Sequence, residues 1–159
     1  METINKMQNT SAQKYYSFII VFVFALFLFV FFKSQPTSNI DINFVKIGGV
    51  DVRVELAIDK TSQERGLSGR ESLAVNTGML FMFNKPDKYY FWMKGMNFPI
   101  DIIWINENNK IVYIKREAQP ENFLETYGPE ENSLYVLEVP SGFSDMHGLK
   151  TGDSVLFLK

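Results

Sequence analysis

An uncharged apolar segment at residues 15–32 constrains this 159-residue chain more than any other feature. It reads YYSFIIVFVFALFLFVFF and contains no charged residue, glycine or proline. A helix on the surface of a soluble core normally has a polar face, which this segment lacks. With a rise of about 1.5 Å per residue, a helix here would be roughly 27 Å long, enough for the hydrocarbon core of a bilayer. We therefore predict one transmembrane helix with the lipid bilayer as its partner.

A cleaved signal peptide is the alternative interpretation of this segment. Cleavage needs a shorter apolar core followed by a small-x-small site, and the sequence KSQPTSNI after Phe32 offers no good match. The chain has no cysteine, which excludes a lipid-modified cysteine as the anchor. We therefore expect the segment to remain attached as a signal anchor.

Basic residues flank the apolar segment unequally. Lys6 and Lys14 precede it, whereas only Lys33 follows it closely. Because Lys and Arg near a membrane span favour the cytoplasmic side, we expect residues 1–14 to form a cytoplasmic tail. The chain is then predicted to be a single-pass protein of the cell membrane, with its C-terminal part outside the cytoplasm.

The C-terminal part divides into a polar linker at residues 33–40 and a domain at 41–159. In VDVRVELAID, which starts at Val50, apolar and polar residues alternate, as expected of a half-buried antiparallel strand. The preceding pair Gly48 and Gly49 suits a two-residue hairpin turn. Further strands are predicted at 79–83, 89–94, 100–105, 111–116, 134–139 and 154–158.

Helical signals in the domain are few. Thr61 and Glu64 fit a capping box that would start a short helix at TSQERGL, and a second helical turn is possible at SGFSDMHG. Many short strands with little helix are typical of β-sandwiches and barrels. The predicted fold is therefore a mainly β, compact antiparallel β-sandwich or barrel-like domain with one or two short helices.

Several classes of chemistry are excluded by residue content. His147 is the only histidine and cysteine is absent, so one chain cannot build a zinc site from histidine and cysteine or use a cysteine nucleophile. No phosphate loop or dinucleotide fingerprint is present. With a formal net charge of −2 and no basic run, the chain is a poor candidate for nucleic acid. We expect neither a metal site nor a cofactor.

Two charged residues in an aromatic stretch mark the candidate site. The sequence YYFWMKGMNFPIDIIWI places Lys94 and Asp101 in apolar surroundings. A buried carboxylate needs a cation or several N–H donors, and Lys94 and Arg65 are the nearest candidates. One interpretation is an ion pair that fixes a corner of the sheet. The other is a ligand site made of Arg65, Trp92, Lys94 and Asp101.

Two acidic features complete the candidate set. Glu138 alternates with Leu137 and Val139 and so points to the opposite face of its strand from them, where solvent exposure is the simplest expectation. The long acidic connection at 116–133 is either an ordinary loop or a functional one.

Four motifs in order resemble the domain of unknown function 192 family: QERGLSGR, GMLFMF, FWMKGMNFPIDIIWI and YVLEVPSGFSDMHGLKTGDSV. The resemblance covers residues 42–159 and implies a compact β-sandwich, often behind a signal peptide or anchor, with no established activity. The recurrent residues of the family match Arg65, Trp92, Met93, Lys94, Pro99, Asp101, Leu137, Glu138, Val139, Gly152 and Asp153. The sequence departs from the family at Ser68, where methionine is usual, and at Gly95 and Met96, where Asn-Thr is common.

These features favour an extracytoplasmic binding or accessory module of the cell envelope, with a monomeric soluble domain. Its ligand would be a small molecule, an envelope polymer or a protein. One alternative is an envelope hydrolase that uses Asp101 and Glu138 as acid and base, because paired carboxylates suffice for glycoside hydrolysis. Another is a purely structural domain.

The predicted topology can be tested with protease added to spheroplasts. We expect a C-terminal tag to be digested while the chain stays in the membrane fraction, since the uncharged segment anchors it. Complete protection of the tag would contradict the orientation. A shortened mature chain in the soluble fraction would contradict the anchor.

Overall fold

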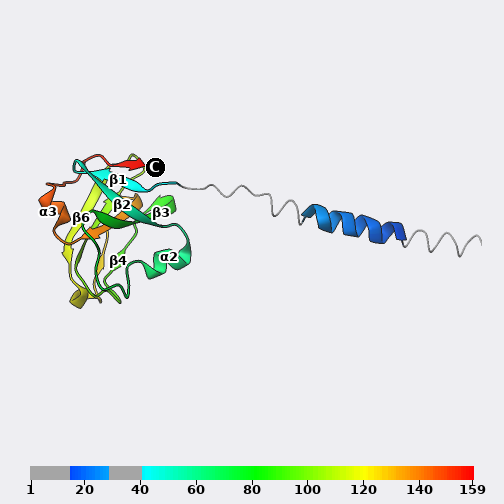
Figure 1. Cartoon of the computed structure of the whole chain (residues 1–159), viewed down its shortest axis with the longest axis horizontal. Helices are drawn as coiled ribbons and strands as arrows, with labels where there is room; N and C mark the ends of the chain where they lie inside the picture. The colour runs from blue at the N-terminus through cyan, green and yellow to red at the C-terminus, as the bar shows by residue number, and fades with distance from the viewer. Residues whose placement is uncertain (1–14, 29–40) are drawn as a thin grey trace, which may run out of the picture. The chain divides into compact units, whose positions relative to one another are not determined.

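The computed structural model describes residues 15–28 and 41–159. Residues 15–28 form a helix, and residues from Asp41 to Lys159 form a separate compact unit (Figure 1). Within the described residues, no helix combines the length and the apolar character needed to cross a membrane. The rest of the predicted span, the N-terminal tail and the linker, at 1–14 and 29–40, lie outside the described residues.

The domain at 41–159 is mainly β, as predicted. Its described residues form a seven-stranded sheet in the order β6-β5-β8-β3-β2-β1-β9 and a two-stranded ribbon of β4 and β7. The sheet strands are β1 (Phe44–Ile47), β2 (Val50–Ala57), β3 (Thr77–Asp87), β5 (Ile100–Ile105), β6 (Ile111–Ala118), β8 (Ser133–Pro140) and β9 (Leu156–Leu158). The ribbon pairs β4 (Phe91–Trp92) with β7 (Thr126–Tyr127), and the helices are α2 (Lys60–Arg65), η1 (Pro120–Asn122) and α3 (Phe143–Met146).

The hairpin of β1 and β2 confirms the predicted two-residue turn at the glycine pair. Ile47 pairs with Val50 across Gly48 and Gly49, both of which have positive φ, as a two-residue turn of this kind requires. The expectation of a wholly antiparallel sheet is wrong, because β2 and β3 are parallel. Parallel neighbours need a crossover connection, which α2 and the loop at 66–76 supply.

Helix α2 begins earlier than the sequence motif suggested. Its N-cap is Asp59, whose carboxylate accepts a hydrogen bond from the Ser62 backbone N–H at 3.0 Å. Ser62 Oγ lies 3.2 Å from the Asp59 backbone N–H and accepts from it, so the capping box joins Asp59 and Ser62. The predicted box of Thr61 and Glu64 is therefore wrong, and Gly66 is the C-cap residue of the helix.

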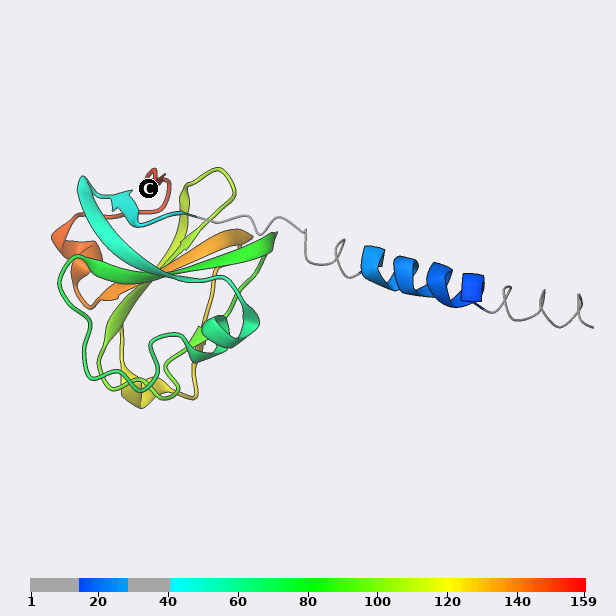
Figure 2. The same cartoon turned by 45° about the vertical axis from the view of Figure 1, so that its right-hand side comes forward.

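The sheet curls so that its outer strands approach each other (Figure 2). Ile111, at the start of β6, donates its backbone N–H to the Asp153 carbonyl at 3.0 Å, and Val155 donates to the Asn109 carbonyl at 2.9 Å. These bonds join the β5–β6 hairpin to the segment before β9. The expected sandwich or barrel is thus realised as one curled sheet with a short ribbon beside it.

Each face of the sheet carries its own apolar core. One core gathers residues of β1, β2, β5 and β8 with Phe143, Leu149 and Val155. The other, on the opposite face, includes Leu67 from the loop after α2 and Tyr127 from the ribbon. Strand β5 is buried along its whole length, because it contributes alternate side chains to both cores.

Asp101, on β5, is bound by backbone N–H groups from two directions. Its Oδ1 accepts from Glu117 at 2.9 Å and from Gly142 at 3.2 Å, and its Oδ2 accepts from Ser144 at 2.7 Å. Glu117 has a φ of 47° at a shift in the β5–β6 register, and Gly142 and Ser144 begin α3. The carboxylate therefore fixes a β-bulge and the start of α3 against the central sheet.

The predicted pairing of Asp101 with Lys94 or Arg65 is wrong. Asp101 is fully buried, and among the described residues no ion pair joins it to a cation. Three N–H donors satisfy a buried carboxylate without one. Asp101 thus holds the fold together, as the structural interpretation expected, but through the backbone.

Replacing Asp101 with alanine is expected to destabilise the domain strongly. The change leaves one buried and two partly buried N–H groups without their acceptor, and hydrogen bonds to a charged group contribute about 1.5–3 kcal/mol each. We expect the free energy of unfolding to fall by about 3 kcal/mol or more, measured by urea denaturation. The exposed Glu107→Ala change serves as the control, and an equally small effect of both changes would contradict the anchoring role.

Candidate functional site

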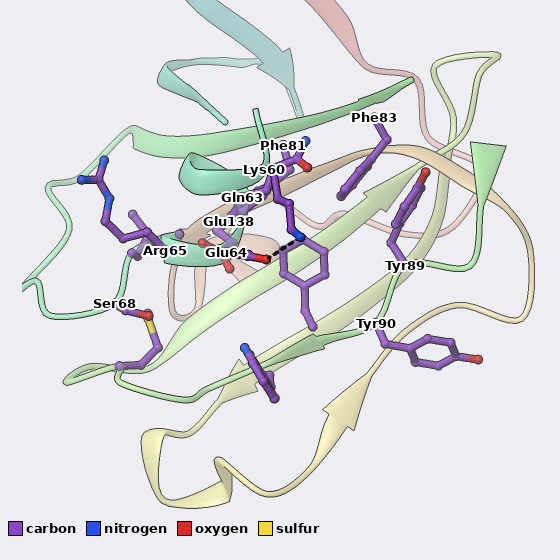
Figure 3. Close-up of a pocket in the computed structure, with 15 residues that line it drawn as sticks. Lys60, Gln63, Glu64, Arg65, Ser68, Phe81, Phe83, Tyr89, Tyr90 and Glu138 are labelled. Atoms are coloured by element: carbon purple, nitrogen blue, oxygen red, sulfur yellow. Dashed lines mark ion pairs between the residues drawn. The ribbon is translucent and has the colours of Figure 1, made fainter. Parts of the chain in front are cut away.

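A cleft of about 580 Å³ lies beside α2 (Figure 3). Six of the side chains that line it are aromatic, and we call it the aromatic cleft. They are Phe81, Phe83, Tyr89, Tyr90, Phe91 and Trp92. These residues come from β3, from β4 and from the segment that joins the two strands.

Ring contacts fix this aromatic wall. Phe83 stacks on Tyr89 with ring centroids 3.5 Å apart, and Phe91 meets Phe81 edge-on at 4.8 Å. The Trp104 indole N–H donates to the Tyr89 carbonyl at 2.7 Å, which ties the returning segment to the buried strand β5. The wall is thus held by the core rather than by a free loop.

Helix α2 forms the other side of the cleft. The Gln63 side chain donates to the carbonyls of Ala57 at 3.2 Å and Met82 at 2.8 Å, which fastens α2 across β2 and β3. Lys60 and Glu64 form an exposed ion pair at 3.7 Å. The helix therefore presents charged side chains at the rim of a largely apolar cleft.

Glu138 lies in this cleft as a buried carboxyl group. It faces Met79 on one neighbouring strand and Ile102 on the other, and only 5% of it is exposed. Its Oε2 has no hydrogen-bond partner among the described residues. Gly66 lies directly above, since a Cβ atom there would sit 3.9 Å from this oxygen and 3.4 Å from Phe81. The absence of a side chain at Gly66 leaves room beside the carboxyl group.

Burial raises the pKa of Glu138 to about 8, and the charge of Arg70 opposes the rise. Arg70 is itself held by Glu55, whose two carboxylate oxygens it contacts at 2.7 Å each. That pairing lowers the pKa of Glu55. The Arg70 guanidinium is therefore committed to Glu55, and Glu138 carries a proton at neutral pH.

The expected solvent exposure of Glu138 is wrong. Alternation correctly places its side chain on the face opposite to Leu137 and Val139, which belong to the other core. That face is covered, however, because α2, the loop after it and the segment before β4 fold over it. Only contacts between distant parts of the chain make it a buried site.

The structure separates the residues of the predicted ligand site. Trp92 and Arg65 line the aromatic cleft, and Figure 3 shows Arg65 pointing away from Glu138. Lys94 lies over the Trp92 ring at 5.3 Å from its centroid. Asp101 and Glu138 project from opposite faces of the sheet, because Asp101 pairs with Val139 and not with Glu138. The pair proposed for a hydrolase is therefore not brought together.

The loop at 66–70 is bound to the turn that follows Lys94. Ser68 donates its hydroxyl to the Lys94 carbonyl at 3.0 Å, and Gly69 donates its N–H to the Gly95 carbonyl at 2.8 Å. A Cβ on Gly95 would lie 3.3 Å from the Ser68 Cβ. Two of the departures from the usual family residues, Ser68 and Gly95, are thus direct neighbours.

The acidic connection at 116–133 does not line the aromatic cleft. It forms η1 and β7, and β7 pairs Tyr127 with Phe91 behind the aromatic wall. The His147 ring packs on Phe143 at 4.5 Å, which fits a structural role. Within 15–28 and 41–159, no group of three acidic or histidine side chains is arranged to hold a metal ion.

Comparisons with known proteins identify the family of this chain and two similar solved structures. A profile of the DUF192 family, described as "Uncharacterized ACR", matches residues 43–157. The crystal structure of a protein of unknown function from Novosphingobium aromaticivorans is similar, with 32% identity, a TM-score of 0.68, and coverage of 77% of this chain and 89% of that one. A candidate transcription regulator from Sinorhizobium meliloti shows 30% identity, a TM-score of 0.67, and coverage of 73% and 91%. No functionally curated protein matches the chain.

Glu138 is expected to make the stability of the domain depend on pH. Its pKa rises from 4.5 in a solvated state to about 8 on folding, so the folded state binds the proton more tightly. The resulting stability is complete below about pH 4.5 and is lost as the pH rises through 8. We expect the free energy of unfolding of Glu138→Gln to rise relative to that of the wild type as the pH increases. Chemical unfolding at pH 5, 7 and 9 measures this difference. A difference that stays constant, as expected for the exposed control Glu107→Gln, would contradict the buried acid.

Proposed function

This chain belongs to the DUF192 family, and we propose that it is a binding module whose ligand occupies the aromatic cleft. One observation carries the proposal. Glu138 offers a buried carboxyl oxygen without a hydrogen-bond partner in a cleft that is largely apolar. A ligand that enters the cleft can supply the missing partner.

The energetic cost of Glu138 supports a functional role. A buried polar group left without a partner costs about 1–3 kcal/mol, which an apolar side chain at this position would avoid. Small-molecule sites are typically mainly apolar clefts of about 300–1,000 Å³ with a few polar groups that orient the ligand. The aromatic cleft, at about 580 Å³, matches this pattern in size and in composition.

The rim of the cleft can extend the contact with a larger ligand. Tyr90 is 59% exposed and Trp92 is 55% exposed, although both are large aromatic side chains beside the opening. Exposed aromatic groups at a concave site often provide contact area for a partner. A small molecule, or a group on an envelope polymer or a protein, is therefore compatible with this cleft.

The apolar segment at 15–32 supports a location at the cell membrane. Its uncharged character favours an anchor, and the basic residues before it favour an extracytoplasmic domain. The Sinorhizobium protein is described as a candidate regulator of transcription. We do not propose this role for the present chain, because it has a formal net charge of −2 and no basic run.

A lone acid–base residue is the second candidate function. The pKa of Glu138, about 8, lies where a general acid or base is effective near neutral pH. Such an enzyme would use Glu138 without Asp101, which faces the other core. A purely structural role of the domain accounts for the hydrogen bonds of Asp101 but not for the unpaired oxygen of Glu138.

Truncating Trp92 is expected to weaken binding in the aromatic cleft. We expect small aromatic compounds, screened by NMR, to perturb the amides of Gly66 and Phe83. In Trp92→Ala their affinity should fall about tenfold, which corresponds to a loss of about 1.4 kcal/mol of contact energy. Leu124→Ala, which removes a side chain that is 86% exposed outside the cleft, should leave it unchanged.

Compounds that map to another face, or that bind Trp92→Ala as tightly as the wild type, would contradict the proposed site. Chemical conversion of a bound compound that stops in Glu138→Gln would instead favour the enzyme.

A further inference from the structure

We propose that the ligand of the aromatic cleft carries a protonated primary or secondary amine, which donates an N–H to the Glu138 carboxylate while its apolar body packs on the aromatic wall. This inference rests on the function proposed above and specifies the chemical class of the ligand.

The first step is that the unpaired oxygen of Glu138 needs a hydrogen-bond donor. Most other polar side chains around the cleft are already engaged, since Gln63 donates to two carbonyls and Ser68 donates to the Lys94 carbonyl. Among the residues that line the cleft and are described here, the buried oxygen without a partner is Oε2 of Glu138. Once ionised, this carboxylate can only accept hydrogen bonds, so the ligand group that complements the ionised form is a donor.

The second step is the preference for a positive charge. Aromatic faces attract cations, and the chain already uses this attraction at the rim, where the Lys94 ammonium lies 5.3 Å from the centroid of the Trp92 ring. An ammonium deeper in the cleft would meet both aromatic faces and the carboxylate.

The third step is that the protein does not supply this cation itself. Lys60 pairs with Glu64 at 3.7 Å, and Arg70 is bound by both oxygens of Glu55. Arg65 points away from Glu138 in Figure 3. The positive charge that would compensate an ionised Glu138 is therefore left for the ligand to bring.

The fourth step links binding to protons. The strands that flank Glu138 present apolar Met79 and Ile102 to it. The titratable and charged groups that line the cleft with it are Lys60, Glu64, Arg65, Tyr89 and Tyr90, and the charge of Arg70 also acts on it. Burial raises the pKa of Tyr89 above its usual 10, so this phenol stays neutral. Glu138 holds a proton up to about pH 8, and an entering ammonium must displace that proton.

The pH dependence of binding follows directly. Well below pH 8 each binding event releases about one proton, so the affinity for an amine rises about tenfold from pH 6 to 7 and about fivefold from pH 7 to 8. Above pH 8 the affinity levels off, because Glu138 is already ionised while an alkylamine, with a pKa of about 10, stays charged. A neutral ligand that accepts a hydrogen bond from the protonated acid would show the opposite trend.

The experiment compares three matched probes by calorimetry with the full chain in a nonionic detergent. They are 2-phenylethylamine, its N,N,N-trimethyl derivative, which keeps the charge but has no N–H, and 2-phenylethanol, which is neutral. We expect the amine to bind most tightly, with a tenfold gain from pH 6 to 7 and one proton released, detected by using buffers of different ionisation enthalpy. Glu138→Gln should abolish the pH dependence and the preference for the amine, whereas Glu107→Gln should preserve both.

The remaining outcomes separate the two proposals. If 2-phenylethanol binds as tightly as the amine, or if amine affinity does not change with pH, the amine inference is overturned. The cleft itself remains the binding site in that case, provided that Trp92→Ala still weakens binding of the alcohol. If none of the three probes binds in a manner sensitive to Trp92→Ala, both the amine inference and the proposed binding function are overturned.

Discussion

The register between β5 and β8 determines where the two important carboxyl groups lie. Asp101 is opposite Val139, and Ile102 is opposite Glu138, so the two acids are offset by one residue. Because successive side chains in a strand point to opposite faces, a one-residue offset sends them into different cores. Asp101 meets the start of α3 and the β5–β6 bulge, whereas Glu138 meets α2 and the aromatic wall. The candidate site depends on this register.

The two buried acids differ in the hydrogen-bond partners of their carboxyl groups. Asp101 receives three backbone N–H groups, which satisfy its charge and join three elements. Glu138 has a free oxygen and responds by retaining its proton, since burial without a partner disfavours the charged form. Proteins tolerate such local costs mainly at functional sites, where the surrounding fold compensates them. Here the compensation comes from two packed cores and from the polar anchor at Asp101.

Local patterns predicted much of the sheet but little of the site. Alternation located β2 and the Gly48–Gly49 turn, because each depends on residues within a few positions. The parallel pairing of β2 with β3 depends on the crossover through α2, which no local pattern reveals. The donors to Asp101 come from residues 16 to 43 positions away. The sequence therefore predicts that this acid needs hydrogen-bond partners, but not which residues provide them. Likewise, alternation gave the face of Glu138 but not the segments that cover it.

The most direct measurement is the titration of the Glu138 carboxyl carbon by NMR, with the resonance assigned through Glu138→Gln. A buried acid without a partner should titrate near pH 8 in the free protein, and a bound amine should move the midpoint to lower pH because its charge favours the carboxylate. A midpoint near the ordinary value of 4.5 in the free protein would show that water or another group already satisfies Glu138. In that case the cleft would lack the unpaired acid from which its function is inferred.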